Sequence, residues 1–345
     1  MKSKPSSAAE ATQELWADAK ARVVRNCDPE SIAVIPQTQR SIPSLAKDKT
    51  ATGKIESLLR GMPTRHEFWE ADSRMLDFLP DSSVHLVVTS PPYWSLKKYN
   101  PHHGQLGEIS DYTAFLEQLT RVWKHCFRVL VPGGRVVCVV GDVCLSRRKN
   151  NGRHTVVPLH ASIQERCRDV GFDNLAPIIW YKIANASLEA AGNGSSFLGK
   201  PYEPNAVIKN DIEFILMERK PGGYRSPSFA ERVFSVIPEE SHRIWFNQIW
   251  TNLPGASTRR HPAPYPVDLV KRLIRMFSFV GDVILDPFLG SGTTSLAAWQ
   301  TGRSSIGIEI DPVYLQNATS RFNKGTAALG SNHEVAVYCK ESPCL

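Results

Sequence analysis

Strand-like and helix-like patterns of hydrophobic residues alternate along most of the chain. Short apolar runs predict buried strands at His85–Thr89, "RVVCVVGD", "LAPIIWYKI", "DIEFILME", "DVILDPF" and "SSIGIEI". Helical spacing predicts helices after Asp111, near Pro158–Val170, over Pro266–Phe277 and after Thr293. Strands that alternate with helices indicate an α/β fold with a doubly wound, largely parallel sheet.

Two stretches interrupt this alternation. The first 60 residues are polar, with one helix-like segment around Ala8–Val24, and we expect them to pack on or near the main domain. Residues 221–260 are rich in Gly, Pro, Ser, Arg and aromatic residues, so they are a candidate insert for substrate recognition.

Composition narrows the class of protein. The chain has 345 residues, 42% hydrophobic and 22% charged, as in soluble globular proteins. It has no apolar run of about 20 residues, and its N-terminus lacks the apolar stretch of a secretory signal. Its seven cysteines have no zinc-site spacing, and an odd number argues against a disulfide framework. We therefore expect no metal and a reducing cytoplasm, while the net charge of +7 is compatible with a polyanionic partner.

The segment "DVILDPFLGSGTTSLAAW" predicts a strand, a tight glycine turn and a helix. Gly290 and Gly292 would let the backbone approach a ligand, and Glu309, at the next strand end, is placed to hold ribose hydroxyls. The turn is not a P-loop, and Ser295 replaces the third glycine of the dinucleotide fingerprint. Asp286 beside the ligand would suit a cationic cofactor, which favours S-adenosylmethionine.

The segment "HLVVTSPPYWSLKKY" contains the candidate catalytic residues. Ser90 Oγ and the Pro91 carbonyl could accept hydrogen bonds from an exocyclic amine and so return its delocalised lone pair to nitrogen. Pro91 and Pro92 would hold this turn rigid, and Tyr93 could stack on the base. A base in duplex DNA would first have to flip out of the helix.

"TSPPYW", "DPFLGSGTT" and "GIEID" resemble the amino-methylating DNA methyltransferases of bacterial restriction–modification systems, in their beta order of motifs. The resemblance covers roughly residues 68–325. It implies a Rossmann-like, S-adenosylmethionine-dependent fold whose seven-stranded mixed sheet ends in an antiparallel pair and carries an inserted target-recognition region. A serine at position 90 is typical of N4-cytosine enzymes, whereas Asp or Asn is typical of N6-adenine enzymes.

The resemblance also implies residue roles. Cofactor contacts would be Asp72, Asp286, Pro287, Phe288, Gly290, Ser291, Gly292, Thr293 and Glu309, with His261 and Pro262 in a closing segment. Tyr93, Trp180 or Tyr181 would stack on the target base, although core packing is an equal alternative for Trp180 and Tyr181. DNA contacts would come from Arg147, Arg148, Lys149 and Arg153 in a basic loop, and from Arg225, Arg232, Arg243, Arg259 and Arg260. For each of these cations taken singly, a solvated surface charge is the alternative.

The implied organisation has five parts. These are an N-terminal extension (1–60), the catalytic part (61–220), the target-recognition region (221–260), the cofactor-binding part (261–325) and a C-terminal tail (326–345). We expect double-stranded DNA as partner, a restriction endonuclease as functional companion, a monomer or homodimer, and a cytoplasmic, nucleoid-associated bacterial or archaeal location.

Other reactions explain the residues less well. C5-cytosine methylation needs a nucleophilic cysteine, and the only Pro-Cys pair is Pro343-Cys344 near the C-terminus. A nicotinamide dehydrogenase leaves the Ser-Pro-Pro-Tyr segment unexplained, and a catalytically idle DNA-binding module leaves both motifs unexplained. N6-adenine methylation of DNA is the main alternative, ahead of methylation of amines in RNA or protein.

Overall fold

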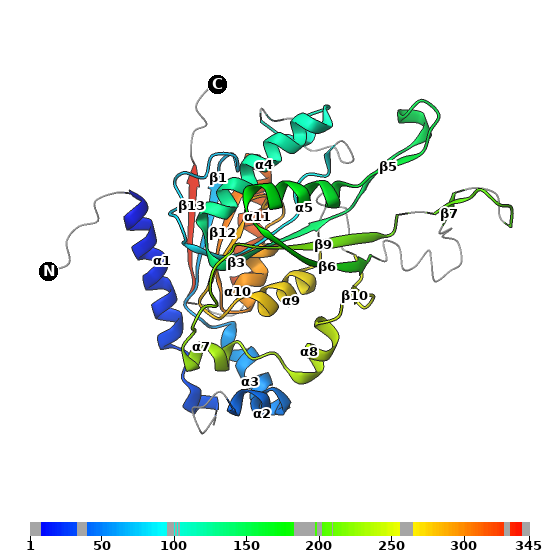
Figure 1. Cartoon of the computed structure of the whole chain (residues 1–345). Coiled ribbons are helices and arrows are strands. Elements are labelled where there is room, and N and C mark those ends of the chain that lie inside the picture. The colour runs from blue at the N-terminus through cyan, green and yellow to red at the C-terminus, as the bar shows by residue number, and fades with distance from the viewer. Residues whose placement is uncertain are drawn as a thin grey trace.

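The computed structural model describes residues 8–32, 40–94, 100, 102, 104–182, 197–198, 202–208, 210–255, 265–327 and 332–339. Within these residues, nine strands form the main sheet in the order β10-β6-β9-β3-β2-β11-β12-β1-β13 (Figure 1). These strands are β1 (Arg65–Glu70), β2 (Val84–Thr89), β3 (Leu130–Val140), β6 (Asp173–Tyr181), β9 (Ile212–Arg219), β10 (Ile249–Trp250), β11 (Val283–Asp286), β12 (Ser304–Glu309) and β13 (Glu334–Cys339). Only β9 runs antiparallel to its neighbours, β3 and β6.

The sheet confirms the α/β class and corrects the number of strands. The predicted antiparallel pair is formed by β6 and β9, as expected. Two further strands extend the expected seven: β10 beside β6 at one end of the sheet, and β13 beside β1 at the other. β13 lies in the segment expected to be a C-terminal tail, so part of that tail belongs to the sheet.

Helices cover both faces of the sheet. One face carries α4 (Tyr112–Val129) and α5 (Leu159–Val170), and the other carries α9 (Val267–Phe277), α10 (Thr293–Gln300) and α11 (Pro312–Thr326). Neighbouring residues of β2 face opposite sides, with Val87 beneath α4 and Leu86 and Val88 in the core with α9. This layering is the doubly wound arrangement that the alternating pattern predicted.

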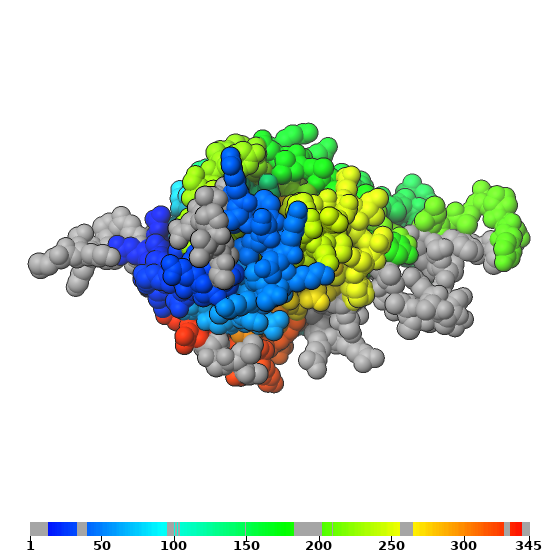
Figure 2. Space-filling model, turned by 90° about the horizontal axis from the view of Figure 1, so that it is seen from below, coloured from blue at the N-terminus to red at the C-terminus, as the bar shows by residue number. Residues whose placement is uncertain are grey.

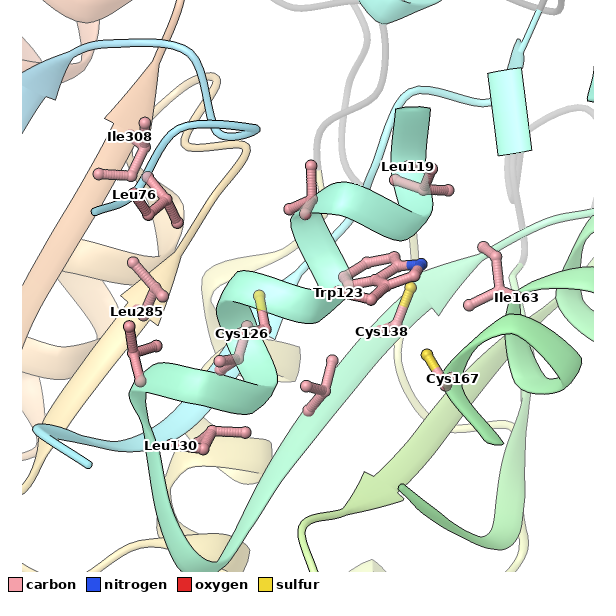
Figure 3. Packing of buried hydrophobic residues seen from close by; sticks show 14 of the residues in the cluster. Leu76, Leu119, Trp123, Cys126, Leu130, Cys138, Ile163, Cys167, Leu285 and Ile308 are labelled. Carbon is pink, nitrogen blue, oxygen red and sulfur yellow. The ribbon is translucent and has the colours of Figure 1, made fainter. Parts of the chain in front are cut away.

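The predicted amphipathic helix after Asp111 is confirmed as α4. Asp111 is its N-cap, because the carboxylate accepts a hydrogen bond from Ala114 N at 2.7 Å. The apolar face of α4, which includes Trp123 and Cys126, packs on β3 and α5 in the core shown in Figure 3. Burial raises the pKa of the Cys126, Cys138 and Cys167 thiols in this core, so they behave as small hydrophobic residues.

The N-terminal extension packs on the edge of the sheet where the parallel strands begin. It contains α1 (Ala8–Arg25), η1 (Pro29–Ile32), α2 (Ser41–Lys47) and α3 (Lys49–Leu59). Ile55 and Leu59 share a core with Val233 and Phe234 of α7 (Phe229–Phe234). The blue N-terminal helices accordingly lie against the yellow-green segment in Figure 2, which also contains α8 (Glu239–Trp245).

The opposite edge, where the parallel strands end, carries two projecting hairpins (Figure 1). One is formed by β4 (Val143–Leu145), η4 (Arg147–Lys149) and β5 (Thr155–Val157), directly after β3. The other is formed by β7 (Phe197–Leu198) and β8 (Val207–Ile208), within the connection from β6 to β9. Both hairpins leave the sheet at the edge where the site described below is built.

Candidate active site

A cavity lies at the carboxyl ends of four neighbouring parallel strands. Asp72 follows β1, Ser90 follows β2, Pro287 follows β11, and Glu309 ends β12. The full lining is Asp72, Ser73, Ser90, Pro92, Gly104, Gln105, Leu106, Tyr265, Pro287, Phe288, Leu289, Gly290, Ser291, Thr293, Ile308, Glu309, Ile310 and Tyr314. Ligands of doubly wound sheets bind at this position, because loops from several strands converge there.

The glycine turn and Glu309 form one hydrogen-bonded unit. Gly290 and Gly292 both have positive φ, 51° and 73°, which few other residues tolerate. Gly290 N donates to Glu309 Oε2 at 2.8 Å, and Asp311 N donates to Oε1 at 3.0 Å. Burial raises the pKa of Glu309 to about 7. The acidic strand end is therefore hydrogen-bonded to the glycine turn, and both line the cavity.

Two predicted cofactor contacts do not line this cavity. Gly292 faces helix α11, where a Cβ atom would come within 3.1 Å of Ala318 Cβ. Asp286 is completely buried beneath the turn, and its carboxylate accepts four hydrogen bonds from neighbouring groups of the chain. The structure thus places the Asp286 carboxylate among donors of the protein and outside the cavity lining, and its direct contact with a cofactor stays a prediction.

The predicted catalytic turn borders the same cavity through Ser90 and Pro92. Ser90 Oγ donates its hydrogen to the Tyr93 hydroxyl at 3.2 Å, and Tyr93 donates in turn to the Val139 carbonyl at 3.4 Å. With its hydrogen turned toward Tyr93, Ser90 Oγ keeps its lone pairs for an incoming donor. The ring of Tyr93, however, is buried in the core beneath α4, so it does not form the exposed stacking platform that the sequence suggested.

The other two aromatic residues predicted to stack on the base, Trp180 and Tyr181, lie in different surroundings. Trp180 is fully buried, and its Nε1 donates to the Leu253 carbonyl at 2.9 Å, so it is a core residue rather than a base contact. Tyr181, the last residue of β6, is partly exposed at the carboxyl edge. Asp72 does line the cavity, with its carboxylate paired to Arg74.

The predicted DNA-contacting cations lie on two different edges. Arg147, Arg148 and Arg153 lie on the β4–β5 hairpin at the catalytic edge, and so does Lys149, whose side chain is outside the described part. Arg225 lies at the opposite edge, where both its terminal nitrogens bond the buried Asp282 at 2.8 and 2.6 Å. Arg232 is on α7, which packs on the N-terminal helices, and its Nε donates to the Pro227 carbonyl.

The segment expected to be a target-recognition region, 221–260, is divided in the structure, and its role in target recognition stays a prediction. Residues 221–236 lie at the edge away from the cavity, against the N-terminal extension. Arg243 is an exposed residue of α8 and pairs with Glu239 one turn earlier. Arg259, Arg260, His261 and Pro262 are outside the described residues.

Several cavity residues were not predicted from the sequence. Gln105 and Leu106 lie at the start of the short 3-10 helix η3 (Leu106–Glu108), in a segment with no local motif. Tyr265 could have been found, because it follows the His-Pro-Ala-Pro segment that resembles the cofactor-closing part of the family. Within the described residues, no cluster of His, Cys, Asp and Glu could hold a metal ion, and no helix is long and apolar enough to span a membrane.

Comparisons with known proteins were made for the whole chain. The model of the N6/N4 DNA methylase family matches residues 84–320. The type II methyltransferase M.MjaI of Methanocaldococcus jannaschii is 36% identical over 277 residues, covering 72% of this chain and 88% of the relative. M.MthZI of Methanothermobacter thermautotrophicus is 34% identical, covering 76% and 78%.

Solved structures agree with these relatives. TTHA0409 from Thermus thermophilus, a candidate DNA modification methylase solved with S-adenosyl-L-methionine, is 49% identical, with a TM-score of 0.64, and covers 80% of this chain and 98% of that one. PvuII DNA methyltransferase, described as cytosine-N4-specific, is 19% identical with a TM-score of 0.52, which supports the fold alone.

The sheet and its carboxyl-edge cavity thus have the α/β methyltransferase fold. The chain belongs to the N6/N4 DNA methylase family, and it is a DNA methyltransferase.

Proposed function

We propose that the protein methylates the exocyclic N4 amine of a flipped cytosine in double-stranded DNA at a specific sequence. The observation that carries this proposal is that Ser90 borders the same cavity as the glycine turn and Glu309. A serine there, in place of Asp or Asn, favours cytosine within a family that includes N6-adenine enzymes. N6 methylation of adenine is the second candidate, because the same turn could accept that amine.

S-adenosylmethionine is the cofactor, and the lining suits it. Asp72 and Glu309 bring carboxylates suited to hydroxyl and cationic groups, while Phe288, Ile310 and Tyr314 bring apolar and aromatic surface suited to an adenine ring. When bound, the cofactor supplies an electrophilic methyl group to the base nitrogen, which loses a proton to water as S-adenosylhomocysteine forms.

The chain's own part in the reaction is to prepare the amine. An exocyclic amine is a weak nucleophile, since its lone pair is delocalised into the ring. Ser90 Oγ, with its hydrogen directed to Tyr93, and the Pro91 carbonyl would accept the two N–H groups and favour a pyramidal nitrogen. Preorganised acceptors then replace a strong base.

The DNA surface in this proposal is the catalytic edge. Both projecting hairpins, including the basic 147–153 loop, leave the sheet at the same carboxyl edge as the cavity (Figure 1), and so does the chain after Trp250 of β10. The β4–β5 hairpin follows β3, which is the neighbour of β2 in the sheet. We therefore assign DNA contact to this edge and not to residues 221–236. In a cell we expect the enzyme to act on the chromosome in the cytoplasm, alongside a restriction endonuclease with the same target.

Identifying the methylated nucleoside tests the proposal. Double-stranded DNA is incubated with the protein and labelled S-adenosylmethionine, digested, and analysed by mass. We expect N4-methyldeoxycytidine. N6-methyldeoxyadenosine would replace the cytosine assignment with the second candidate, and absence of label from every nucleoside would overturn the proposed activity.

A further inference from the structure

The carboxylate of Asp286 lies at a junction of four chain segments. Oδ1 accepts hydrogen bonds from Thr89 Oγ1 at 2.7 Å and from Phe288 N at 3.0 Å. Oδ2 accepts from Thr294 Oγ1 at 2.6 Å and from the Tyr265 hydroxyl at 2.9 Å. An ionised carboxylate has about four acceptor positions, and these four groups surround them. The Tyr265 hydroxyl also lies 2.6 Å from Thr294 Oγ1, where either oxygen can be the donor, so the two hydroxyls and Oδ2 form one hydrogen-bonded cluster.

Each donor belongs to a segment that builds part of the site. Thr89 ends β2 and directly precedes Ser90. Phe288 belongs to the turn after β11, and Thr294 to the first turn of α10. Tyr265 precedes α9 and also lines the cavity. One buried group therefore connects the catalytic turn, the cofactor turn and the segment before α9.

The junction depends on an acceptor-only group. Asparagine has nearly the same shape, but its amide nitrogen would face two donors and leave them unpaired in a buried site. Burial raises the pKa of Asp286, and the three hydroxyl donors and the Phe288 amide oppose that rise. Removing one donor should therefore make the carboxylate easier to protonate.

We propose that Asp286 is a positioning residue for methyl transfer. Its hydrogen bonds fix the position of Ser90 relative to the Gly290–Gly292 turn, and Tyr265 links the segment before α9 to the same carboxylate. This inference rests on the proposed methyltransferase function. It assigns Asp286 a role through its neighbours and not through contact with the cofactor.

Two near-isosteric variants test the proposal. Thr89→Val and Tyr265→Phe each remove one hydroxyl donor and keep the shape of the side chain. Thr120→Val and Tyr338→Phe are matched controls, since their hydroxyls bond the Leu116 carbonyl and Arg65, away from the cavity. Asp286→Asn is the third variant, with circular dichroism to establish that each protein is folded.

The measurements are kcat, the Kd for S-adenosylmethionine, and the pH profile of kcat. For Thr89→Val we expect kcat to fall about tenfold, as for loss of one hydrogen bond to a charged group, with Kd changed less than about twofold. For Tyr265→Phe we expect the acidic limb of the pH profile to move to higher pH. For Asp286→Asn we expect a larger loss of kcat, and both controls should match the wild type.

Two results would overturn the positioning role. One is wild-type kcat and an unmoved pH profile in both donor variants. The other is an Asp286→Asn protein that loses cofactor affinity while the donor variants remain normal, which would indicate direct contact. Wild-type activity is measured as label in any base, so a different methylated base would change the proposed function without affecting this test.

Discussion

Glu218 is a carboxylate in the protein core, and the part of the chain that the structure describes gives it no cationic partner. It lies on β9, opposite Val136 of β3, and is completely buried. Neither of its side-chain oxygens has a partner in hydrogen-bonding geometry in the described part of the chain. Burial accordingly raises its pKa from 4.5 to about 7, and the nearby Gln164 side chain opposes only part of that rise.

This shift makes stability depend on pH. A carboxyl with a raised folded-state pKa does not affect stability at low pH, where it is neutral in both the folded and the unfolded state. It opposes folding as the pH rises above the unfolded pKa of 4.5, and the cost is complete above about pH 7, where it reaches at most about 3.5 kcal/mol, from roughly 1.4 kcal/mol for each pKa unit.

Glu218→Gln removes the charge and keeps the shape. At pH 8 we expect the free energy of unfolding to rise by about 2 kcal/mol, less than the full value because a buried amide also lacks partners. At pH 4.5 the variant and the wild type should differ little. Urea denaturation at both pH values measures this, with the exposed Glu117→Gln on α4 as control.

A Glu218→Gln protein that is less stable than the wild type at pH 8 would refute the reasoning. That result would mean that the ionised carboxylate is stabilised by a partner in solution. A gain of equal size at both pH values would also contradict it, because the effect would then not come from ionisation.

Three further predictions concern the site and the charged edges. Ser90→Ala should keep its affinity for S-adenosylmethionine but lose about 100-fold in kcat, as for removal of one preorganised partner; unchanged turnover would exclude Ser90 from the mechanism. Arg225→Ala should lower the free energy of unfolding by about 3 kcal/mol, because Asp282 stays buried, without changing DNA affinity in a fluorescence titration. The hairpin arginines Arg147, Arg148 and Arg153 can be replaced by Gln. This change should weaken DNA binding, and the slope of log affinity against log salt concentration should fall by about one for each phosphate that is no longer neutralised. An unchanged slope would mean that DNA binds elsewhere on the protein.

Local patterns predicted the architecture well, because amphipathic helices repeat apolar residues at helical spacing and buried strands appear as short apolar runs. α4 illustrates this, with its N-cap at Asp111 and its buried face both predicted. The strands of the main sheet that were not predicted had weak local signals. β1, with the sequence RHEFWE, mixes charged and apolar residues. β10 has two residues, and β13 alternates Val335 and Val337 with other residues in a segment treated as a tail.

Roles that depend on distant partners could not be predicted in the same way. Asp286 was placed beside the cofactor, because nothing in its neighbourhood indicates that Thr89 approaches from a strand far away in the chain. Arg225 and Asp282 are likewise separated in sequence, so the arginine looked like a surface cation. Trp180 was ambiguous from the sequence, and burial decided for the core.

The strand order has a consequence for biosynthesis. β11 and β12 insert between β2 and β1, so Leu86 near Ser90 pairs with Ile284, far along the chain. The ribosome must therefore synthesise almost the whole chain before β11 and β12 can insert and complete the sheet. Contacts so distant in sequence slow folding. Until these contacts form, the apolar residues of β1 and β2 remain exposed and can bind chaperones or other chains. Nascent chains stalled before residue 283 should for this reason bind no S-adenosylmethionine, whatever part of the catalytic turn they already contain.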